Sequence, residues 1–131
     1  MSGETNLQTL IKNMTPQLNE GDYVFCTVDA ISKIEINDVI CFFKEAESCT
    51  IIVKQSVADK LGLIYSYIAA WITLTVHSSL DAVGLTAAFS TALGDKGISC
   101  NVVAAFYHDH IFVRKEDAEK AMFVLNNLTR E

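Results

Sequence analysis

The sequence predicts an α+β fold made of two ferredoxin-like halves, with antiparallel sheets and helices packed on one face. Residues 70–128 follow the order strand, helix, strand, strand, helix, which is a ferredoxin-like unit without its last strand. The first half repeats a similar order in degenerate form, without visible sequence identity. The 131 residues, 50% of them hydrophobic, suffice for one compact domain or two small halves that share a core. We therefore divide the chain into residues 1–68 and 69–131.

The first half is expected to form two short helices and a group of strands. Asn6 can cap a helix that ends at Thr15-Pro16, and Gly62 can end a second helix over residues 56–61. Residues 63–69 fit either a strand or a linker between the halves. Apolar runs bounded by turn residues predict three strands, the last two joined as a hairpin: residues 23–28, 39–44 and 49–54.

The second half shows clearer patterns. Apolar and polar residues alternate over 72–77, as on a half-buried strand, and an apolar helical stripe follows Gly84. Two further strands are expected at residues 101–107 and 110–113, and the strongest helix at 116–128. A sheet that lacks its last strand exposes an edge, which proteins usually cover. We therefore expect a strand from the first half to complete or extend the second.

Composition excludes several classes of partner. A formal charge of −6, with ten basic residues scattered among sixteen acidic ones, argues against nucleic acid. The N-terminus lacks the pattern of a signal peptide, and the longest apolar run, over residues 61–76, is too short to span a bilayer. The four cysteines form no CxxC pair, which is typical of reduced, buried thiols. We expect a cytoplasmic protein that binds neither nucleic acid nor membrane.

The segment that precedes the helix after Gly84 is the main candidate for a binding site. Ser78 and Asp81 offer a hydroxyl and a carboxylate before the helix, in a spacing close to that of a capping box. Gly84 leaves the backbone bare where the helix begins, and free N–H groups at a helix N-terminus attract carboxylates and phosphates. The alternative is that Ser78 and Asp81 only cap the helix, and the two roles can coexist.

The three histidines suggest a second possibility. The predicted topology gathers His77, His108 and His110 at one edge of the sheet, beside Asp109 and the segment 78–84. Imidazole and carboxylate groups are acceptable ligands for a transition metal. The simpler interpretation is that the histidines hold the neighbouring loop by hydrogen bonds. We expect no metal and no other cofactor, and no signature of a known catalytic site occurs in the sequence.

Two segments carry a resemblance to a known family. Residues 72–88 read ITLTVHSSLDAVGLTAA, and residues 97–113 read GISCNVVAAFYHDHIFV. They resemble the ACT-type ligand-binding domain, in the variant found in CASTOR-type amino-acid sensors and in small bacterial relatives of uncharacterised role. Residues 7–63 look like the pseudo-ACT segment that precedes this domain. The resemblance implies a non-catalytic regulatory fold whose domains pair side by side and bind amino acids at the interface.

The resemblance also implies where a ligand would bind. Family contacts come from the loop after the first strand, the start of the next helix, and the backbone where the second strand begins. Here these are His77, Ser78, Ser79, Asp81, Val83, Gly84, Leu85, Asn101 and Val102. We thus expect a regulatory module that binds an amino acid or similar small ligand and forms a homo-oligomer. The alternatives are a small metal- or Cys-dependent enzyme using the histidine edge, and a purely structural interaction protein.

Overall fold

The computed structural model describes residues 6–75 and 83–129. The chain divides into two compact units. Unit 1 consists of Met1–Glu20 and Ala70–Glu131, and unit 2 of Gly21–Ala69. The first twenty residues thus group with the C-terminal part of the chain, from Ala70 onwards. Each unit is described by itself below.

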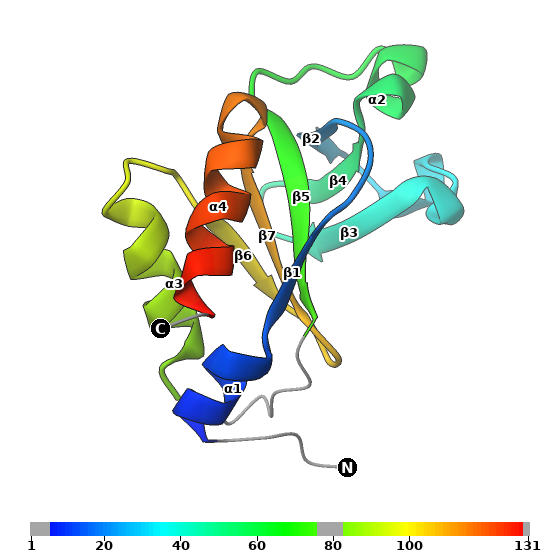
Figure 1. The fold of residues 1–131 in the computed structure, drawn as a ribbon. Helices are drawn as coiled ribbons and strands as arrows, with labels where there is room; N and C mark the ends of the chain where they lie inside the picture. Colours follow the sequence, from blue (N-terminus) through cyan, green and yellow to red (C-terminus); the bar gives the residue numbers. More distant parts are fainter. Residues whose placement is uncertain (1–5, 76–82, 130–131) are drawn as a thin grey trace. The chain divides into compact units, whose positions relative to one another are not determined.

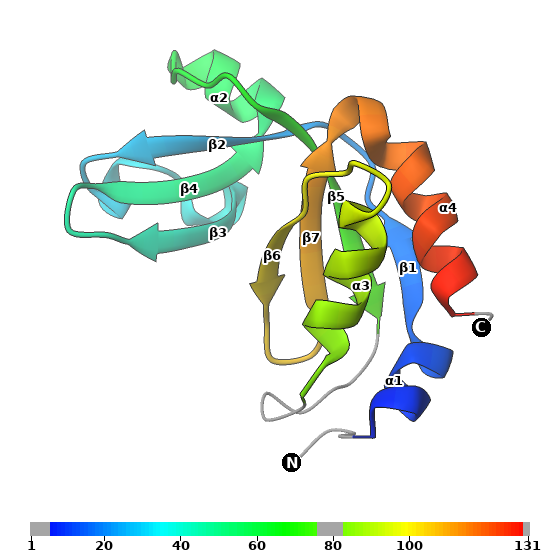
Figure 2. The same ribbon diagram turned by 90° about the vertical axis from the view of Figure 1, so that its left-hand side faces the viewer.

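Unit 1 has a four-stranded sheet with helices on one face (Figures 1 and 2). Along the chain its strands are β1 (Thr15–Leu18), β5 (Ile68–Thr75), β6 (Asn101–Ala104) and β7 (Asp109–Arg114). Across the sheet their order is β1-β5-β7-β6. Its helices are α1 (Leu7–Asn13), α3 (Leu85–Gly94), the 3₁₀ turn η3 (Lys115–Asp117) and α4 (Ala118–Leu128).

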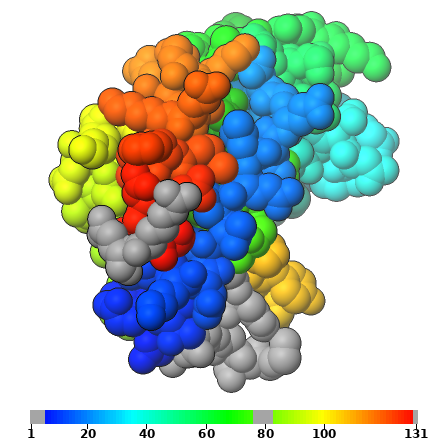
Figure 3. Space-filling model, in the orientation of Figure 1, coloured from blue at the N-terminus to red at the C-terminus, as the bar shows by residue number. Residues whose placement is uncertain are grey.

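The expected completion of the sheet is confirmed, and β1 is the strand that supplies it. β1 pairs antiparallel with β5, with Thr15 opposite Thr75 and Leu18 opposite Ile72. Pro16 is tolerated because β1 is an edge strand, where a missing N–H costs no ladder bond on the open side. In Figure 3 this N-terminal segment, in blue, lies against α4, in orange to red, in agreement with the contacts between α4 and β1.

The core of unit 1 lies between its sheet and its helices. α1 begins where expected, since the Asn6 side chain accepts a hydrogen bond from the Thr9 N–H at 3.0 Å, and it buries Leu10. Strand alternation sends Ile72 and Leu74 into the core and leaves Thr73 on the opposite face of the sheet. The central core residues are fully buried: Leu10, Ile72, Leu74, Phe89, Leu93, Ile111, Val113, Ala121 and Leu125.

Unit 2 contains three strands in the order β3-β4-β2: β2 (Tyr23–Val28), β3 (Val39–Lys44) and β4 (Cys49–Lys54). These bounds confirm the three predicted strands. Two 3₁₀ turns, η1 (Ile31–Lys33) and η2 (Ile36–Asp38), stand between β2 and β3, and α2 (Gln55–Leu61) follows β4. Gly62 ends α2 in the left-handed conformation, as expected. Alternate residues of β2 and β4, with Ala58 of α2, make a separate small core.

Several predicted bounds differ from the structure for local reasons. Residues 63–69, which fitted either a strand or a linker, are part linker and part strand, because β5 begins at Ile68 and pairs there with Val24. β6 stops at Ala104, since residues 105–108 form the turn into β7, where the Ala105 N–H donates to the His108 carbonyl. The last helix starts at Ala118 because η3 takes up its expected first turn.

Candidate ligand-binding site

The N-terminus of α3 is the part of the predicted site that the structure describes best. Gly84 is the N-cap of α3, with φ at +99°, and its carbonyl accepts the first helical hydrogen bond, from the Ala88 N–H at 2.9 Å. The N–H groups of the first turn have no partner within the helix itself. A glycine cannot cap them with a side chain, and N–H groups of this kind can bind a carboxylate or phosphate.

Glycine is also required at position 84 for a structural reason that the sequence did not reveal. A positive φ of this size disfavours residues with a Cβ, and a Cβ at Gly84 would approach Leu7 Cδ2 of α1 to 3.1 Å. We had interpreted the bare backbone as room for a ligand carboxylate. Leu7 occupies the space on the Cβ side, so any ligand would have to approach the N–H groups of α3 from another direction.

The other predicted ligand contacts near α3 differ in how exposed they are. Val83 is 81% exposed, while Leu85 is buried and belongs to the core of unit 1, so only its backbone can face a ligand. His77, Ser78, Ser79 and Asp81 lie outside the described residues, and their roles stay a prediction.

Asn101 and Val102 lie at the other end of unit 1. α3 begins at the end of the sheet that carries the β6–β7 turn, whereas β6 starts at the opposite end (Figure 2). The Asn101 side-chain amide donates to the Phe112 carbonyl at 3.3 Å, and the Val102 side chain packs against the core. The structure therefore does not bring Asn101 and Val102 together with Gly84 within one copy of unit 1.

The backbone of Val102 nevertheless points to an open edge. Ala105 and His108 form a hydrogen-bonded pair, and the register continues with Val103 opposite His110. In an antiparallel ladder the residues between such pairs direct their N–H and C=O groups away from the partner strand. Val102 and Ala104 thus present peptide groups to the side away from β7, where β6 is the last strand of the sheet.

The histidines occupy different environments. His110 Nδ1 accepts a hydrogen bond from Trp71 Nε1 at 3.0 Å and lies 3.2 Å from Thr73 Oγ1. Asn19 extends this network, because its side-chain amide donates to Thr73 Oγ1 at 2.9 Å. His110 Nδ1 therefore bonds to β5 in the middle of the sheet, and most of the loop that we expected His110 to hold lies outside the described residues. Burial, and next the charge of His108, lower the pKa of His110.

The turn between β6 and β7 combines exposed rings with buried polar groups. Phe106 and Tyr107 are largely exposed and contact each other edge to face. His108 Nδ1 is buried and has no hydrogen-bond partner among the residues that the structure describes. Asp109 is only 6% exposed, and this burial raises the pKa of its carboxyl, against the opposing influence of His108.

Sequence reasoning missed the network around His110. The sequence signal that could have revealed this network is strand alternation, which places Trp71 and Thr73 on the same face of β5. A threonine within an apolar strand and the single tryptophan of the chain both need hydrogen-bond partners when buried. The register that brings His110 beside them could not be read from the sequence.

Metal ligation finds no support in the part of the chain that the structure describes. Among residues 6–75 and 83–129, no group of three histidine, cysteine or acidic side chains is arranged to hold a metal ion. All four cysteines are free thiols; Cys26 and Cys49 are buried, while Cys41 and Cys100 are half-buried. Within the same residues, no helix has the length and apolar character needed to cross a membrane.

Comparison with known families identifies both parts of the chain. One model of the ACT domain matches residues 2–70, and a second model of the ACT domain matches residues 66–127. The chain belongs to the ACT-domain family. The two matches together span almost its whole length, so the chain is a tandem of ACT domains, and the resemblance noted from the sequence is confirmed.

Solved structures agree with this assignment. A protein of unknown function from Vibrio cholerae, described as a possible transport protein, is 48% identical over 94% of this chain and 95% of its own, with a TM-score of 0.86. The ligand-free regulatory subunit of aspartate kinase from Thermus thermophilus is 13% identical, covering 89% of this chain and 99% of its own, with a TM-score of 0.61.

A third similar structure is that of a whole enzyme. Aspartokinase III of E. coli, in complex with aspartate and ADP, is 13% identical over 92% of this chain and 35% of its own, with a TM-score of 0.64. At this identity the likeness to the two kinases shows the shared fold alone. No curated protein matches the chain.

Proposed function

We propose that this tandem of ACT domains is a non-catalytic regulatory module that binds an amino acid, or a small ligand like it, at the N-terminus of α3. The observation that carries the proposal is the start of that helix, where a glycine N-cap leaves the first-turn N–H groups without a side-chain partner of its own. The carboxylate of an amino acid is the kind of group that such N–H groups bind.

The comparisons add support of a general kind. Most of the chain is matched by ACT-domain models, and structures of the same fold include the regulatory subunit of an aspartate kinase and an aspartokinase complex with aspartate.

We further propose that a second copy of the chain completes the site. The outward peptide groups of Val102 and Ala104 lie on an edge strand, at a distance from Gly84 within one copy. An open edge strand can pair with a strand of another molecule, so a second copy of the chain could pair along β6. A ligand held by the start of α3 in one copy and the β6 backbone of its partner would link binding to association.

A thermal-shift screen of the purified protein against the standard amino acids tests the proposal. A ligand that binds only the folded state stabilises it by RT ln(1 + [L]/Kd), about 2.7 kcal/mol at a hundredfold excess over Kd. We expect at least one amino acid to raise Tm. Divalent metals are screened in parallel, since a shift with zinc or nickel alone would favour the histidine edge as the functional site.

A pair of aspartate substitutions on α3 then locates the site. Thr86 and Thr91 are both exposed, the first in the first turn of α3 and the second near its C-terminal end. A carboxylate in the first turn competes with a ligand carboxylate for the same N–H groups and repels it. Thr86→Asp should weaken binding about tenfold or more, and Thr91→Asp should leave it unchanged. Equal affinities in both variants by calorimetry would place the site elsewhere.

A further inference from the structure

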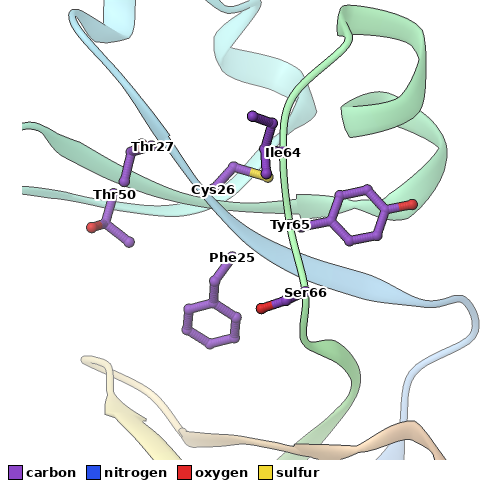
Figure 4. A pocket seen from close by; sticks show the side chains of 7 residues that line it. All are labelled: Phe25, Cys26, Thr27, Thr50, Ile64, Tyr65 and Ser66. Carbon is purple, nitrogen blue, oxygen red and sulfur yellow. The ribbon is translucent and has the colours of Figure 1, made fainter.

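Unit 2 contains a cavity that the ligand site on α3 does not involve. Its volume is about 320 Å³, at the lower end of the range for small-molecule sites. β2 forms one wall, and the segment between α2 and β5 forms the other (Figure 4). Seven residues line it: Phe25, Cys26, Thr27, Thr50, Ile64, Tyr65 and Ser66.

The cavity lies at a gap in the sheet. β2 pairs with β5 at Tyr23 and Val24, and residues 64–66, which line the cavity together with Thr27, precede the start of β5 at Ile68. The Gln55 N–H donates to the Asp22 carbonyl at 2.8 Å, which makes these two residues a hydrogen-bonded pair of the β2–β4 ladder. It follows from the alternation of such pairs that Thr27 directs its own N–H and C=O away from β4, towards the cavity.

The outer wall is held apart from β2 by side-chain bonds. The Tyr65 phenol donates to Asp59 at 2.7 Å and accepts from the Gln55 amide at 2.9 Å, and both partners belong to α2. In Figure 4 the Tyr65 ring lies on the far side of its ribbon from Phe25, whereas the Ser66 hydroxyl points towards Phe25. The Tyr65 anchor therefore keeps the backbone of residues 64–66 away from Thr27, and the cavity exists before any ligand binds.

The side chains that line the cavity determine which chemical class of ligand it can bind. None of the seven side chains carries a charge, and burial raises the pKa of the Cys26 thiol, which keeps it neutral. Phe25 and Ile64 supply apolar surface, and the Phe25 ring is fixed edge-on against Tyr67 at 6.3 Å between centroids. The Thr50 hydroxyl donates to Glu45, so the hydroxyls of Thr27 and Ser66 are the ones left without a partner among the described residues.

We propose that this cavity binds a small, uncharged, peptide-like amide, which hydrogen-bonds to the backbone of Thr27 as a neighbouring strand would. An amide carries a donor and an acceptor in the arrangement that the Thr27 peptide groups would meet in a neighbouring strand. A short aliphatic group on the ligand would lie against Phe25 and Ile64. A charged ligand would lose its hydration without gaining a charged partner.

The test is a titration of the ¹⁵N-labelled full chain with N-acetyl-L-valine methylamide through the millimolar range. We expect saturable changes of amide chemical shift centred on Thr27, Tyr65 and Ser66. N-acetyl-L-aspartate, whose carboxylates find no cation in the cavity, should leave the same signals in place. The absence of changes at these residues with the valine amide, or equal changes with both probes, would overturn the proposal.

Two leucine substitutions provide a matched comparison. Ser66→Leu fills the cavity from its wall, and Ser56→Leu makes the same change at an exposed position on α2 that does not line it. Binding of the valine amide should weaken about tenfold or more in Ser66→Leu and persist in Ser56→Leu. Unchanged binding in a folded Ser66→Leu would overturn the proposal. If that variant does not fold, the shift map of the unmodified chain decides by itself.

Discussion

Gly84 combines two demands at one residue, a positive φ at the start of α3 and close contact with Leu7. Gly84→Ala should destabilise the protein by about 1–3 kcal/mol, because alanine must adopt a strained backbone conformation and its Cβ must displace the Leu7 side chain. Urea unfolding measures the change.

Gly94 is the matched control for Gly84. It lies in α3 without a positive φ, and a Cβ there meets no atom within 4 Å. Gly94→Ala should therefore stabilise the protein by about 0.5–1 kcal/mol. If both alanine variants had the same stability, the special role of Gly84 would be contradicted.

His110 makes stability depend on pH. Its Nδ1 accepts from Trp71, so the neutral ring carries its proton on Nε2, and protonation of Nδ1 breaks that bond. Because the pKa is lower in the folded state, the unfolded state binds more protons. The contribution of His110 is therefore complete above its ordinary pKa of about 6.5 and is lost as pH falls below that value.

Urea midpoints measured between about pH 8 and pH 5 test this expectation, with Trp71 fluorescence as the probe. His110→Gln keeps a hydrogen-bonding group but does not titrate, so its midpoint should fall less with acidification than that of the unmodified chain. His108→Gln leaves His110 in place and removes only the smaller cause of its lowered pKa, so this variant should retain most of the decline. An identical decline in the unmodified chain and His110→Gln would contradict the assignment.

At the level of single residues, sequence could identify candidates but not their partners. The Asn6 cap and the Gly62 helix end followed from local rules, which need only neighbouring residues. The contact of Gly84 with Leu7 and the bond of His110 to Trp71 join residues far apart in the chain, and only the folded register creates them.

Among the elements, α1 illustrates how a short helix contributes to a core. Leu10 is fully buried in unit 1, whereas Gln8 is exposed on the same helix. Leu10→Ala should lower the free energy of unfolding by about 2–5 kcal/mol, and Gln8→Ala should change it by less than about 0.5 kcal/mol. A small effect of Leu10→Ala would mean that α1 is not part of the folded core.

β1 shows why one element escaped sequence prediction. Its four residues include Pro16, which sequence rules treat as the end of a helix or a break in a strand. The strand exists because the edge of β5 is available to pair with it, and this opportunity is a property of the assembled sheet. The longer elements, such as α4 and the β3–β4 hairpin, were predictable because their own periodicity specifies them.

At the scale of the whole molecule, association through β6 gives a testable expectation. Sedimentation at tens of micromolar should show a species heavier than the 14.4 kDa chain. Ala104→Pro removes an N–H that points to the open edge and takes no part in the β6–β7 ladder, so it should weaken association. Ala104→Ser keeps that N–H and should associate normally. A monomer under all conditions, with or without ligand, would contradict the proposal.

The tandem itself was predictable, because each half carries an order of apolar patterns typical of a ferredoxin-like unit. The grouping of the first twenty residues with the C-terminal part was not, since it depends on pairing between β1 and β5 across the whole of residues 21–69.

That pairing has a consequence for how the protein is made. Because β1 and β5 are neighbours in one sheet, unit 2 is an insertion whose entry and exit strands lie side by side, with the Asn19 N–H bonded to the Trp71 carbonyl at 2.9 Å. On the ribosome, β1 emerges first and must wait for the synthesis of residues 21–69 before its partner exists. Unit 2 can acquire its native contacts while unit 1 is still missing strands, so synthesis from the N-terminus favours completion of the inserted unit before its host.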